Sequence, residues 1–146
     1  MEFSNYTFSE SMGHQLAEAT RLMSNRLNQR FKANHFPVTF EQWTILIHLW
    51  VEDGLSQREL CIKSKKDNPS VCRLIDNMIK RGLVERVPHP TDRRTNLIYL
   101  TSEGKKLEEK LKREAFNNVQ DATNGIGQNE IDICFQVLKQ IIKNLE

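Results

Sequence analysis

Apolar residues recur at helical spacing through most of the chain, and a short polar stretch after residue 88 interrupts this pattern. Between residues 9 and 34 the apolar positions fall at intervals of four and seven, which keeps them on one face of a helix. This spacing predicts a long amphipathic helix near the start of the chain. The residues on its apolar face are Met12, Leu16, Met23, Leu27 and Phe31.

Three shorter helices are predicted next, over residues 38–54, 55–63 and 66–82. The first two begin with the pattern of a capping box, formed by Thr39 with Gln42 and by Ser56 with Glu59. The third can be capped by Asp67 or Asn68, and Pro69 suits its first turn. Its residues separate onto two faces, with Val71, Leu74, Ile75 and Met78 expected inside and Arg73, Asp76 and Lys80 expected outside.

The stretch that follows predicts a β-hairpin. Residues 83–88 and 96–100 are rich in Val, Ile, Leu and Tyr, which favours strands. The sequence HPTDRRT between them contains turn formers. An acid and two arginines at a hairpin tip cannot support a core, so we expect the tip to meet something outside the protein.

Two more helices follow the hairpin. Thr101 can cap a helix that runs to about Asn124, where Gly125 to Gly127 break it. The final helix has an apolar seam at intervals of three and four, which is a heptad pattern. The seam consists of Ile131, Cys134, Leu138, Ile141 and Leu145. Together these elements predict a mainly α fold with a small β-wing, that is, a winged helix-turn-helix plus a helical dimerisation region.

Charge changes this picture by suggesting a partner. Residues 56–106 contain twelve Lys or Arg and six Asp or Glu, a net charge of +6, whereas the rest of the chain has nine and thirteen, a net charge of −4. A basic middle is the electrostatic footprint of a nucleic-acid-binding protein. A chance cluster on a solvated face would have the same charge, so composition alone leaves both interpretations open.

The helix over 66–82 and the hairpin supply the candidate contacts to double-stranded DNA. The polar side of such a helix can enter the major groove, and an arginine on a thin hairpin suits the narrow minor groove. We expect Asp92 to hold the guanidinium of Arg94 through a charge-assisted contact. The alternative is that the polar residues only cap helices and that the arginines form weak exposed ion pairs. The predicted DNA-contacting residues are Ser56, Gln57, Asn68, Pro69, Ser70, Arg73, Asn77, Asp92, Arg93, Arg94 and Thr95.

The terminal helices have more apolar surface than one subunit needs, which predicts a homodimer. Two subunits would place two DNA-reading helices about one DNA turn apart, over a roughly palindromic site. Packing of the terminal helices within one chain is the alternative. The predicted interface consists of Met12, Leu16, Ile131, Cys134, Leu138, Ile141 and Leu145.

A small organic effector is expected to bind between the terminal helices and the DNA-binding module, where aromatic residues surround a few polar groups. The candidate pocket residues are His14, Trp43, Ile47, Trp50 and Phe116, which can equally belong to the core. Cys61 and Cys72 are expected to be ordinary thiols, and the alternative is a redox switch whose oxidation beside the groove disturbs DNA contact. Cys134 is expected in the core, and His48 in the core or a pocket. The cysteines and histidines lack the spacing of a metal site, so no metal or cofactor is predicted.

The stretch TDRRTNLIYLTSEG resembles the MarR family of bacterial transcription regulators, whose Asp-x-Arg wing is followed by Leu-Thr-x-x-Gly. The matching residues are Asp92, Arg94, Leu100, Thr101 and Gly104. The resemblance runs from about residue 39 to residue 107 and, in helix layout, covers nearly the whole chain. It implies a homodimer with a three-stranded winged helix-turn-helix over 37–101 and a dimerisation region over 1–36 and 102–146. Such regulators typically repress transcription and release DNA when a small ligand binds.

Some features depart from the family or bear on other functions. Ser64 and Lys66 stand where the family usually has apolar residues between its two DNA-binding helices. A winged-helix module that binds protein instead of DNA is the alternative function. The sequence has no P-loop, Rossmann glycines, nucleophile elbow or His-Glu-x-x-His motif, so we do not predict an enzyme. It also shows neither a signal-peptide pattern nor a membrane-length apolar run, so we expect a cytoplasmic protein that does not bind membranes.

Overall fold

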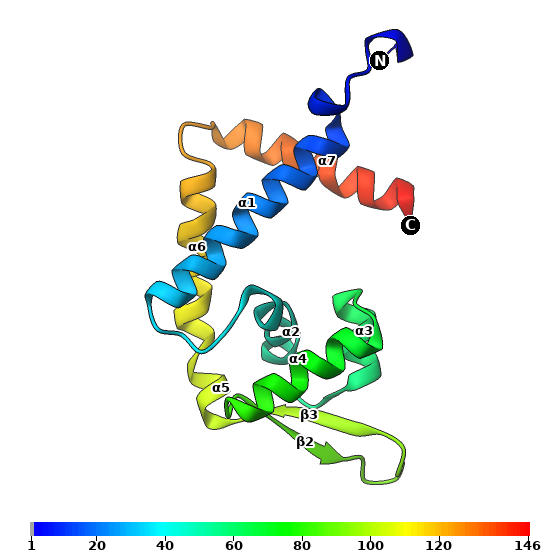
Figure 1. Ribbon diagram of the computed structural model, residues 1–146, viewed down its shortest axis with the longest axis vertical. Helices are drawn as coiled ribbons and strands as arrows, with labels where there is room; N and C mark the ends of the chain where they lie inside the picture. Colours follow the sequence, from blue (N-terminus) through cyan, green and yellow to red (C-terminus); the bar gives the residue numbers. More distant parts are fainter. Residues whose placement is uncertain (1) are drawn as a thin grey trace.

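Residues 2–146 are described in the computed structural model, and this part of the chain forms seven α-helices and a three-stranded sheet (Figure 1). The helices are α1 (Met12–Ala33), α2 (Phe40–Val51), α3 (Gln57–Ser64), α4 (Asn68–Lys80), α5 (Ser102–Lys106), α6 (Glu108–Ala122) and α7 (Gln128–Leu145). The strands are β1 (Leu55–Ser56), β2 (Val84–Pro88) and β3 (Asn96–Leu100), and two 3-10 turns, η1 (Phe3–Asn5) and η2 (Phe8–Glu10), precede α1. The predicted fold class, mainly α with a small β-wing, is confirmed.

The sheet joins the hairpin to the start of α3. Its strand order is β1-β3-β2 with antiparallel pairing throughout, and Ile98 pairs with Arg86 on one side and Leu55 on the other. Asp53 stabilises the junction, because its Oδ1 accepts from the N–H of Leu100 at 2.8 Å. The residue pattern alone did not predict β1, whereas the family resemblance implied a third strand.

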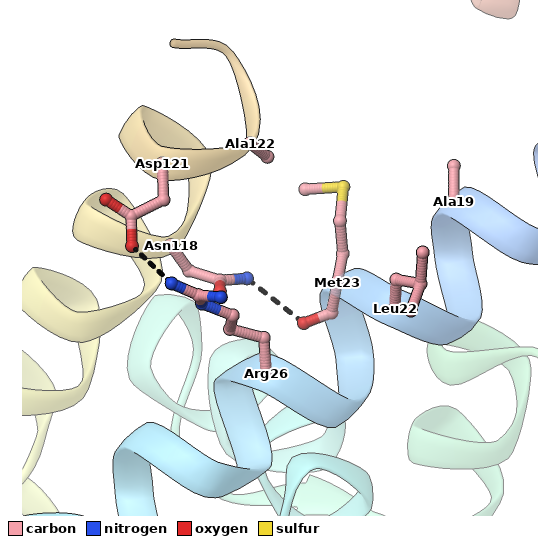
Figure 2. A pocket seen from close by; sticks show the side chains of 7 residues that line it. All are labelled: Ala19, Leu22, Met23, Arg26, Asn118, Asp121 and Ala122. Carbon is pink, nitrogen blue, oxygen red and sulfur yellow. Dashed lines mark hydrogen bonds and ion pairs between the residues drawn. The ribbon is translucent and has the colours of Figure 1, made fainter.

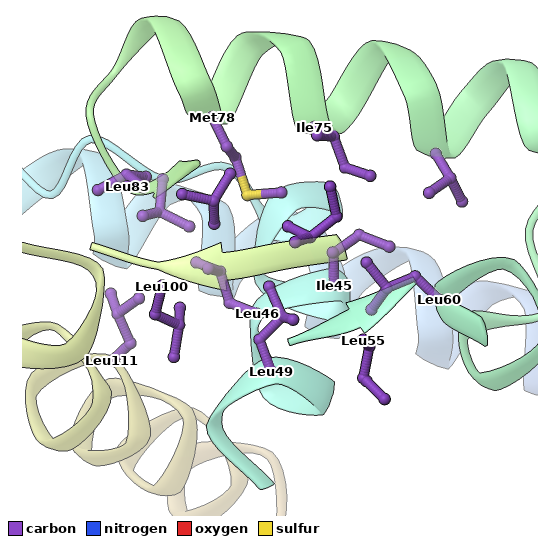
Figure 3. Packing of buried hydrophobic residues seen from close by; sticks show 14 of the residues in the cluster. Ile45, Leu46, Leu49, Leu55, Leu60, Ile75, Met78, Leu83, Leu100 and Leu111 are labelled. Carbon is purple, nitrogen blue, oxygen red and sulfur yellow. The ribbon is translucent and has the colours of Figure 1, made fainter. Parts of the chain in front are cut away.

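The hydrophobic core lies between α2, α3, α4 and the sheet, and α1 and α6 also bury residues in it (Figure 3). Ile45, Leu60, Ile75 and Ile98 are each fully buried there. Helix α4 contributes the face that its sequence predicted, with Val71, Ile75 and Met78 fully buried and Leu74 packed against the cluster. Because every element of the module buries residues in this one cluster, the outer face of α4 is held at a fixed position relative to the wing.

The helix starts follow the predicted capping patterns. Capping boxes form at Thr39 with Gln42 and at Ser56 with Glu59. Of the two candidate caps for α4, the structure selects Asp67, whose Oδ1 accepts from the N–H of Ser70 at 2.8 Å. Hydrogen bonds from Ser70, and to a smaller extent the charge of Arg73, hold the pKa of Asp67 below its ordinary value. The side chain of Asn68 is therefore available for another contact.

The turn between α3 and α4 accommodates the departures from the family pattern. Lys65 has φ of 56°, the left-handed conformation that ends α3. Lys66 forms an ion pair with Glu41 of α2. The hydroxyl oxygen of Ser64 is buried without a hydrogen-bond partner among residues 2–146. The ion pair and the contacts of α3 with α2 and α4 hold this turn in position, without apolar side chains in the turn itself.

The predicted single helix from Thr101 to about Asn124 is wrong, because it is divided into α5 and α6 at Leu107. Thr101 does cap the first piece, since its Oγ1 accepts from the N–H of Gly104 at 3.1 Å. Nε1 of Trp50 donates to the carbonyl of Gly104 at 3.1 Å, the acceptor that a continuous helix would offer to Glu108. A Cβ at Gly104 would lie 2.2 Å from the carbonyl oxygen of Leu83, so this contact requires glycine.

Helices α1 and α6 pack together above the winged module, and α7 lies at the end of the molecule away from the wing (Figure 1). Arg30 of α1 forms ion pairs with Glu114 and Asp121 of α6. Nδ2 of the buried Asn118 donates to the carbonyl of Met23 at 3.1 Å. Within residues 2–146, no helix is long and apolar enough to cross a membrane.

Candidate nucleic-acid interface

The outer face of α4 is polar and open to solvent. Asn68, Pro69, Arg73 and Asn77 are exposed along it, and Ser70 is half-buried in the first turn. Apart from Pro69, the large apolar residues of the same helix lie in or against the core, so the two faces are separated. An α-helix has the width to enter the major groove, which is about 12 Å wide.

Asn68 connects α4 to α3. Nε2 of Gln57 donates to Oδ1 of Asn68 at 2.8 Å, and Sγ of Cys61 lies 3.7 Å from the same oxygen. Gln57 is the first residue of α3 and Asn68 the first residue of α4. This hydrogen bond fixes the relative position of the two side chains at the starts of α3 and α4.

The wing tip is ordered by hydrogen bonds to Asp92 and His89. The carboxylate of Asp92 accepts from the N–H of Arg94 at 3.0 Å and from the hydroxyl of Thr95 at 2.8 Å. These bonds, the one from Arg94 first, hold the pKa of Asp92 below its ordinary value. Nδ1 of His89 accepts from the N–H groups of Thr91 and Asp92 at 3.2 and 3.1 Å. Both side chains therefore act as local caps for the loop backbone.

The predicted contact between Asp92 and the guanidinium of Arg94 is wrong. Among the described residues, Asp92 bonds to the backbone of Arg94 and not to its side chain. A carboxylate two residues before a turn N–H commonly accepts from it, because this closes an Asx turn. Arg93 and Arg94 are both exposed, and neither forms an ion pair within residues 2–146. Their charges remain available for a partner.

A polar notch of about 290 Å³ lies between α3, α4 and the wing. Its lining consists of Ser56, Gln57, Arg58, Asn68, Arg94, Thr95 and Asn96. Five predicted DNA-contacting residues thus meet in one place, namely Ser56, Gln57, Asn68, Arg94 and Thr95. The others lie outside the notch, with Pro69, Ser70, Arg73 and Asn77 along α4 and Asp92 and Arg93 at the wing tip. Buried Ser56 serves mainly as the cap of α3.

Sequence reasoning missed three residues of this surface. Arg58 and Asn96 line the notch, and Arg86 of the wing forms an ion pair with Asp76 of α4 at 2.8 Å. Arg58 could have been found, because it follows two predicted contacts at the start of α3. Arg86 could not, because its partner is brought near by the fold. This ion pair offsets an acidic charge on the face that would approach DNA.

Comparisons with known proteins identify this arrangement. A family model described as the MarR family matches residues 36–95. The solved structure of the transcriptional regulator PA3341 is 31% identical, has a TM-score of 0.78, and matches over 92% of this chain and 98% of its own. The chain belongs to the MarR family of transcription regulators. It is accordingly a DNA-binding regulator and not an enzyme.

Other similar proteins support this assignment along most of the length. The HTH-type transcriptional regulator YybA of Bacillus subtilis is 24% identical over 126 residues, which is 86% of this chain and 83% of YybA. The structure of BpsR from Bordetella bronchiseptica, whose DNA binding is regulated by 6-hydroxynicotinic acid, is 25% identical with a TM-score of 0.83. That match covers 93% of this chain and 96% of BpsR. The MarR fold therefore extends beyond the winged module to the terminal helices.

In this MarR protein, the surroundings of Cys61 disfavour its thiolate form. Burial, with a smaller contribution from the nearby charge of Asp67, raises the pKa of the Cys61 thiol. A raised pKa leaves less thiolate, the form that reacts with oxidants. His48 is half-buried on α2, and burial lowers the pKa of its imidazole. Neither observation indicates a metal or redox role.

The five residues predicted for an effector pocket lie on three helices, with Trp43, Ile47 and Trp50 along one face of α2, His14 on α1 and Phe116 on α6. The Trp43 ring packs against Phe31 and Phe40, with ring centres 6.4 and 5.9 Å away. Trp50 reaches the backbone at Gly104, as described above, and Ile47 is half-buried on the same helix. His14 lies in the first turn of α1, and Phe116 is exposed on α6. The tryptophans serve here as edges of the core.

A cavity of about 370 Å³ lies elsewhere, between α1 and α6 (Figure 2). Its walls are Ala19, Leu22, Met23 and Arg26 from α1 and Asn118, Asp121 and Ala122 from α6. Arg26 and Asp121 form an ion pair at 3.4 Å on one side, and Met23 and Leu22 supply apolar surface on the other. Its size falls within the range of about 300–1,000 Å³ typical of small-molecule sites.

All seven predicted dimer residues are exposed or half-buried in the single chain. Met12, Cys134 and Leu145 are exposed, and Leu16, Ile131, Leu138 and Ile141 are half-buried. The expectation that Cys134 belongs to the core is wrong for one subunit, because none of the described residues of α7 is buried. Ile133, Phe135 and Ile142 add to this uncovered apolar surface, with exposed fractions of 59, 54 and 53%.

Proposed function

We propose that this MarR-family protein is a homodimeric repressor that binds a pseudo-palindromic DNA operator and is released by a small ligand. The observation that carries the proposal is the joint placement of the polar face of α4 and of Arg94 on an ordered wing. The two features lie side by side, with the notch between them. Because DNA is the partner, we place the protein in the cytoplasm.

The geometry suits two adjacent grooves of one duplex. Helix α4 would lie in the major groove, where the exposed Arg73 and Asn77 can reach base edges or phosphates. The wing would extend to the neighbouring minor groove, where arginine is favoured by the concentrated negative potential. The helix starts of α3 and α4 add backbone N–H groups that favour a phosphate nearby.

We also propose that residues 1–36 and 102–146 form the dimerisation region around the winged module of residues 37–101. The uncovered apolar surface of α7 supports this division, because monomeric proteins rarely expose contiguous apolar patches of this kind. Phe3 and Phe8 at the start of the chain are also exposed, which adds apolar surface to the proposed dimerisation region. A second copy of the chain would supply matching surface through two-fold symmetry.

For the effector we propose the cavity between α1 and α6. It is the right size for a small organic molecule, and it combines apolar walls with Arg26, Asp121 and Asn118. Regulation of BpsR by 6-hydroxynicotinic acid supports a small aromatic acid as the class. A ligand wedged between α1 and α6 would change the position of the winged modules if α6 moved with it.

The proposal is tested by selecting bound fragments from random duplex DNA and by measuring the mass of the free protein by light scattering. We expect a dimer and a palindromic consensus with half-sites about one helical turn apart. The affinity should fall steeply as salt is raised, since phosphate contacts release counterions. A monomer, or a protein that retains no duplex at low ionic strength, would reject it. A partner bound equally well at high salt would favour a protein-interaction module instead.

A further inference from the structure

Gln57 and Asn68 form one hydrogen-bonded unit, called here the amide pair. Nε2 of Gln57 donates to Oδ1 of Asn68 at 2.8 Å, and Cys61 Sγ approaches the same oxygen at 3.7 Å. Asn68 is free for this contact because Asp67 provides the cap of α4. The pair therefore joins the first residues of the two helices that would face DNA.

The hydrogen-bonding groups left over by the pair are complementary to each other. A carboxamide has one acceptor oxygen and one NH₂ donor group. The pair uses the oxygen of Asn68 and one N–H of Gln57. Oε1 of Gln57 and Nδ2 of Asn68 have no hydrogen-bond partner among residues 2–146. The pair thus offers the free acceptor Oε1 of Gln57 and the free donor group Nδ2 of Asn68 on the wall of the notch, beside Arg94, in addition to the second N–H of Gln57.

We propose that the amide pair selects adenine at one position in each half of the operator. The inference rests on the proposed DNA-binding function and deepens it. In the major groove, adenine presents the N6 donor beside the N7 acceptor, which matches one acceptor and one donor. Guanine presents two acceptors there, cytosine a donor, and thymine an acceptor with a methyl group. Of the four bases taken singly, adenine alone presents both a donor for Oε1 of Gln57 and an acceptor for Nδ2 of Asn68.

The internal hydrogen bond gives the pair an advantage over a lone amide. A free Gln or Asn side chain loses rotamer freedom when it binds. The bond between Gln57 and Asn68 has already restricted both side chains before DNA arrives. It also assigns which group of each amide is left to face the base, which a freely rotating amide does not do.

The decisive variant is Asn68→Asp, tested by selection from random duplex DNA and by affinity for the selected operator. Aspartate keeps the oxygen that accepts from Gln57, and an acid suits the first turn of α4. The free NH₂ of Asn68 becomes an oxygen, which cannot donate to adenine N7 but can accept from cytosine N4. We expect the adenine preference at one symmetric pair of positions to fall by roughly tenfold to a hundredfold.

Asn96→Asp is the matched control, because Asn96 lines the same notch and acquires the same charge outside the pair. It should weaken binding to all sequences similarly and leave the adenine position unchanged. Gln57→Ala tests the composite character of the site, since it leaves Asn68 intact but unrestrained. We expect the adenine preference to fall in Gln57→Ala as well.

The outcomes separate this inference from the function on which it rests. If the wild-type protein selects no duplex, the proposed function and the inference both fail. If it selects an operator whose preference is unchanged in Asn68→Asp relative to Asn96→Asp, the inference alone is overturned. Retained adenine preference in Gln57→Ala would equally overturn it, since Asn68 would then act alone. Loss in both pair variants, with the control unaffected, supports it.

Discussion

The winged module and helix α7 differ in what covers their apolar side chains. In the winged module, Leu60 of α3, Ile75 of α4 and Ile98 of β3 are fully buried within one chain. In α7 none of the described residues is buried, although Phe135, Ile142 and their neighbours are as apolar as the core residues. The first region can fold around its own core, whereas the second has surface that a single chain leaves in water.

The two regions therefore obtain their stability from different sources, one from burial within the chain and the other, in the proposed dimer, from burial against a partner. Burying a large aliphatic side chain contributes about 1.5–3 kcal/mol, so the fully buried residues stabilise the winged module directly. Helix α7 has no fully buried side chain within its own chain and would gain such burial from a partner. We therefore expect substitutions in the two regions to act on different measurable quantities, unfolding in one and association in the other.

The largest expected effect is on the closed core. Ile75→Ala should lower the free energy of unfolding by about 2–5 kcal/mol in urea denaturation, because it leaves a cavity among residues that cannot fully collapse. The same substitution at Ile62, which is 67% exposed on α3, should change it by no more than about 0.5 kcal/mol. Equal effects at the two positions would contradict the burial assigned to Ile75.

The winged module was also the region best predicted from sequence, because its signals are local. Capping boxes at Thr39 and Ser56 depend on residues three apart, and the two faces of α4 follow from helical spacing alone. The Asp-x-Arg wing and Gly104 identified the family for the same reason. Such features need no knowledge of what packs against them.

Contacts between distant residues were not predictable in this way. Strand β1 has two residues, and its existence depends on pairing of Leu55 with Ile98. The spacing of Asp92 and Arg94 predicted that the two residues lie close together. It did not predict whether the carboxylate accepts a hydrogen bond from the backbone N–H or from the guanidinium of Arg94. The amide pair of Gln57 and Asn68 requires α3 and α4 to meet at their starts, which only the folded chain establishes.

The next effect concerns association through α7. Ile142→Asp should raise the dimer dissociation constant by roughly tenfold or more if this residue lies in an interface, measured by light scattering over a concentration series. The mutant should lose operator affinity in parallel, because two half-sites need two linked subunits. Asn144→Asp is the control, since it adds the same charge on α7 at a position that is already polar. If Ile142→Asp associates like the control, α7 is not the interface.

A smaller effect is expected from the wing. Arg94→Ala should weaken operator binding by about 1–3 kcal/mol in fluorescence anisotropy. Its unfolding free energy should stay close to that of the wild type, because Arg94 is exposed and supports no core residue. Arg21→Ala removes the same side chain from an exposed ion pair on α1 and should leave DNA affinity unchanged. An Arg94→Ala protein that binds the operator normally would remove the wing from the interface.

The smallest expected effect is a local loss of order in the wing loop at low pH. A titration tests whether the Asp92 carboxylate orders this loop without affecting α7. The pKa of Asp92 is lowered in the folded chain, first by the hydrogen bond from the N–H of Arg94. The ionised carboxylate therefore stabilises the loop fully at pH values above its unfolded pKa of about 3.9. This stabilisation is lost as the pH falls through the lower pKa of the folded chain. The amide shift of Arg94, followed by NMR from pH 7 downward, should therefore change with a midpoint below about 3.9. In Asp92→Asn this transition should disappear, while the amide shifts of α7 residues remain those of the wild type. A midpoint at or above the ordinary value would show that the carboxylate does not hold the loop in solution.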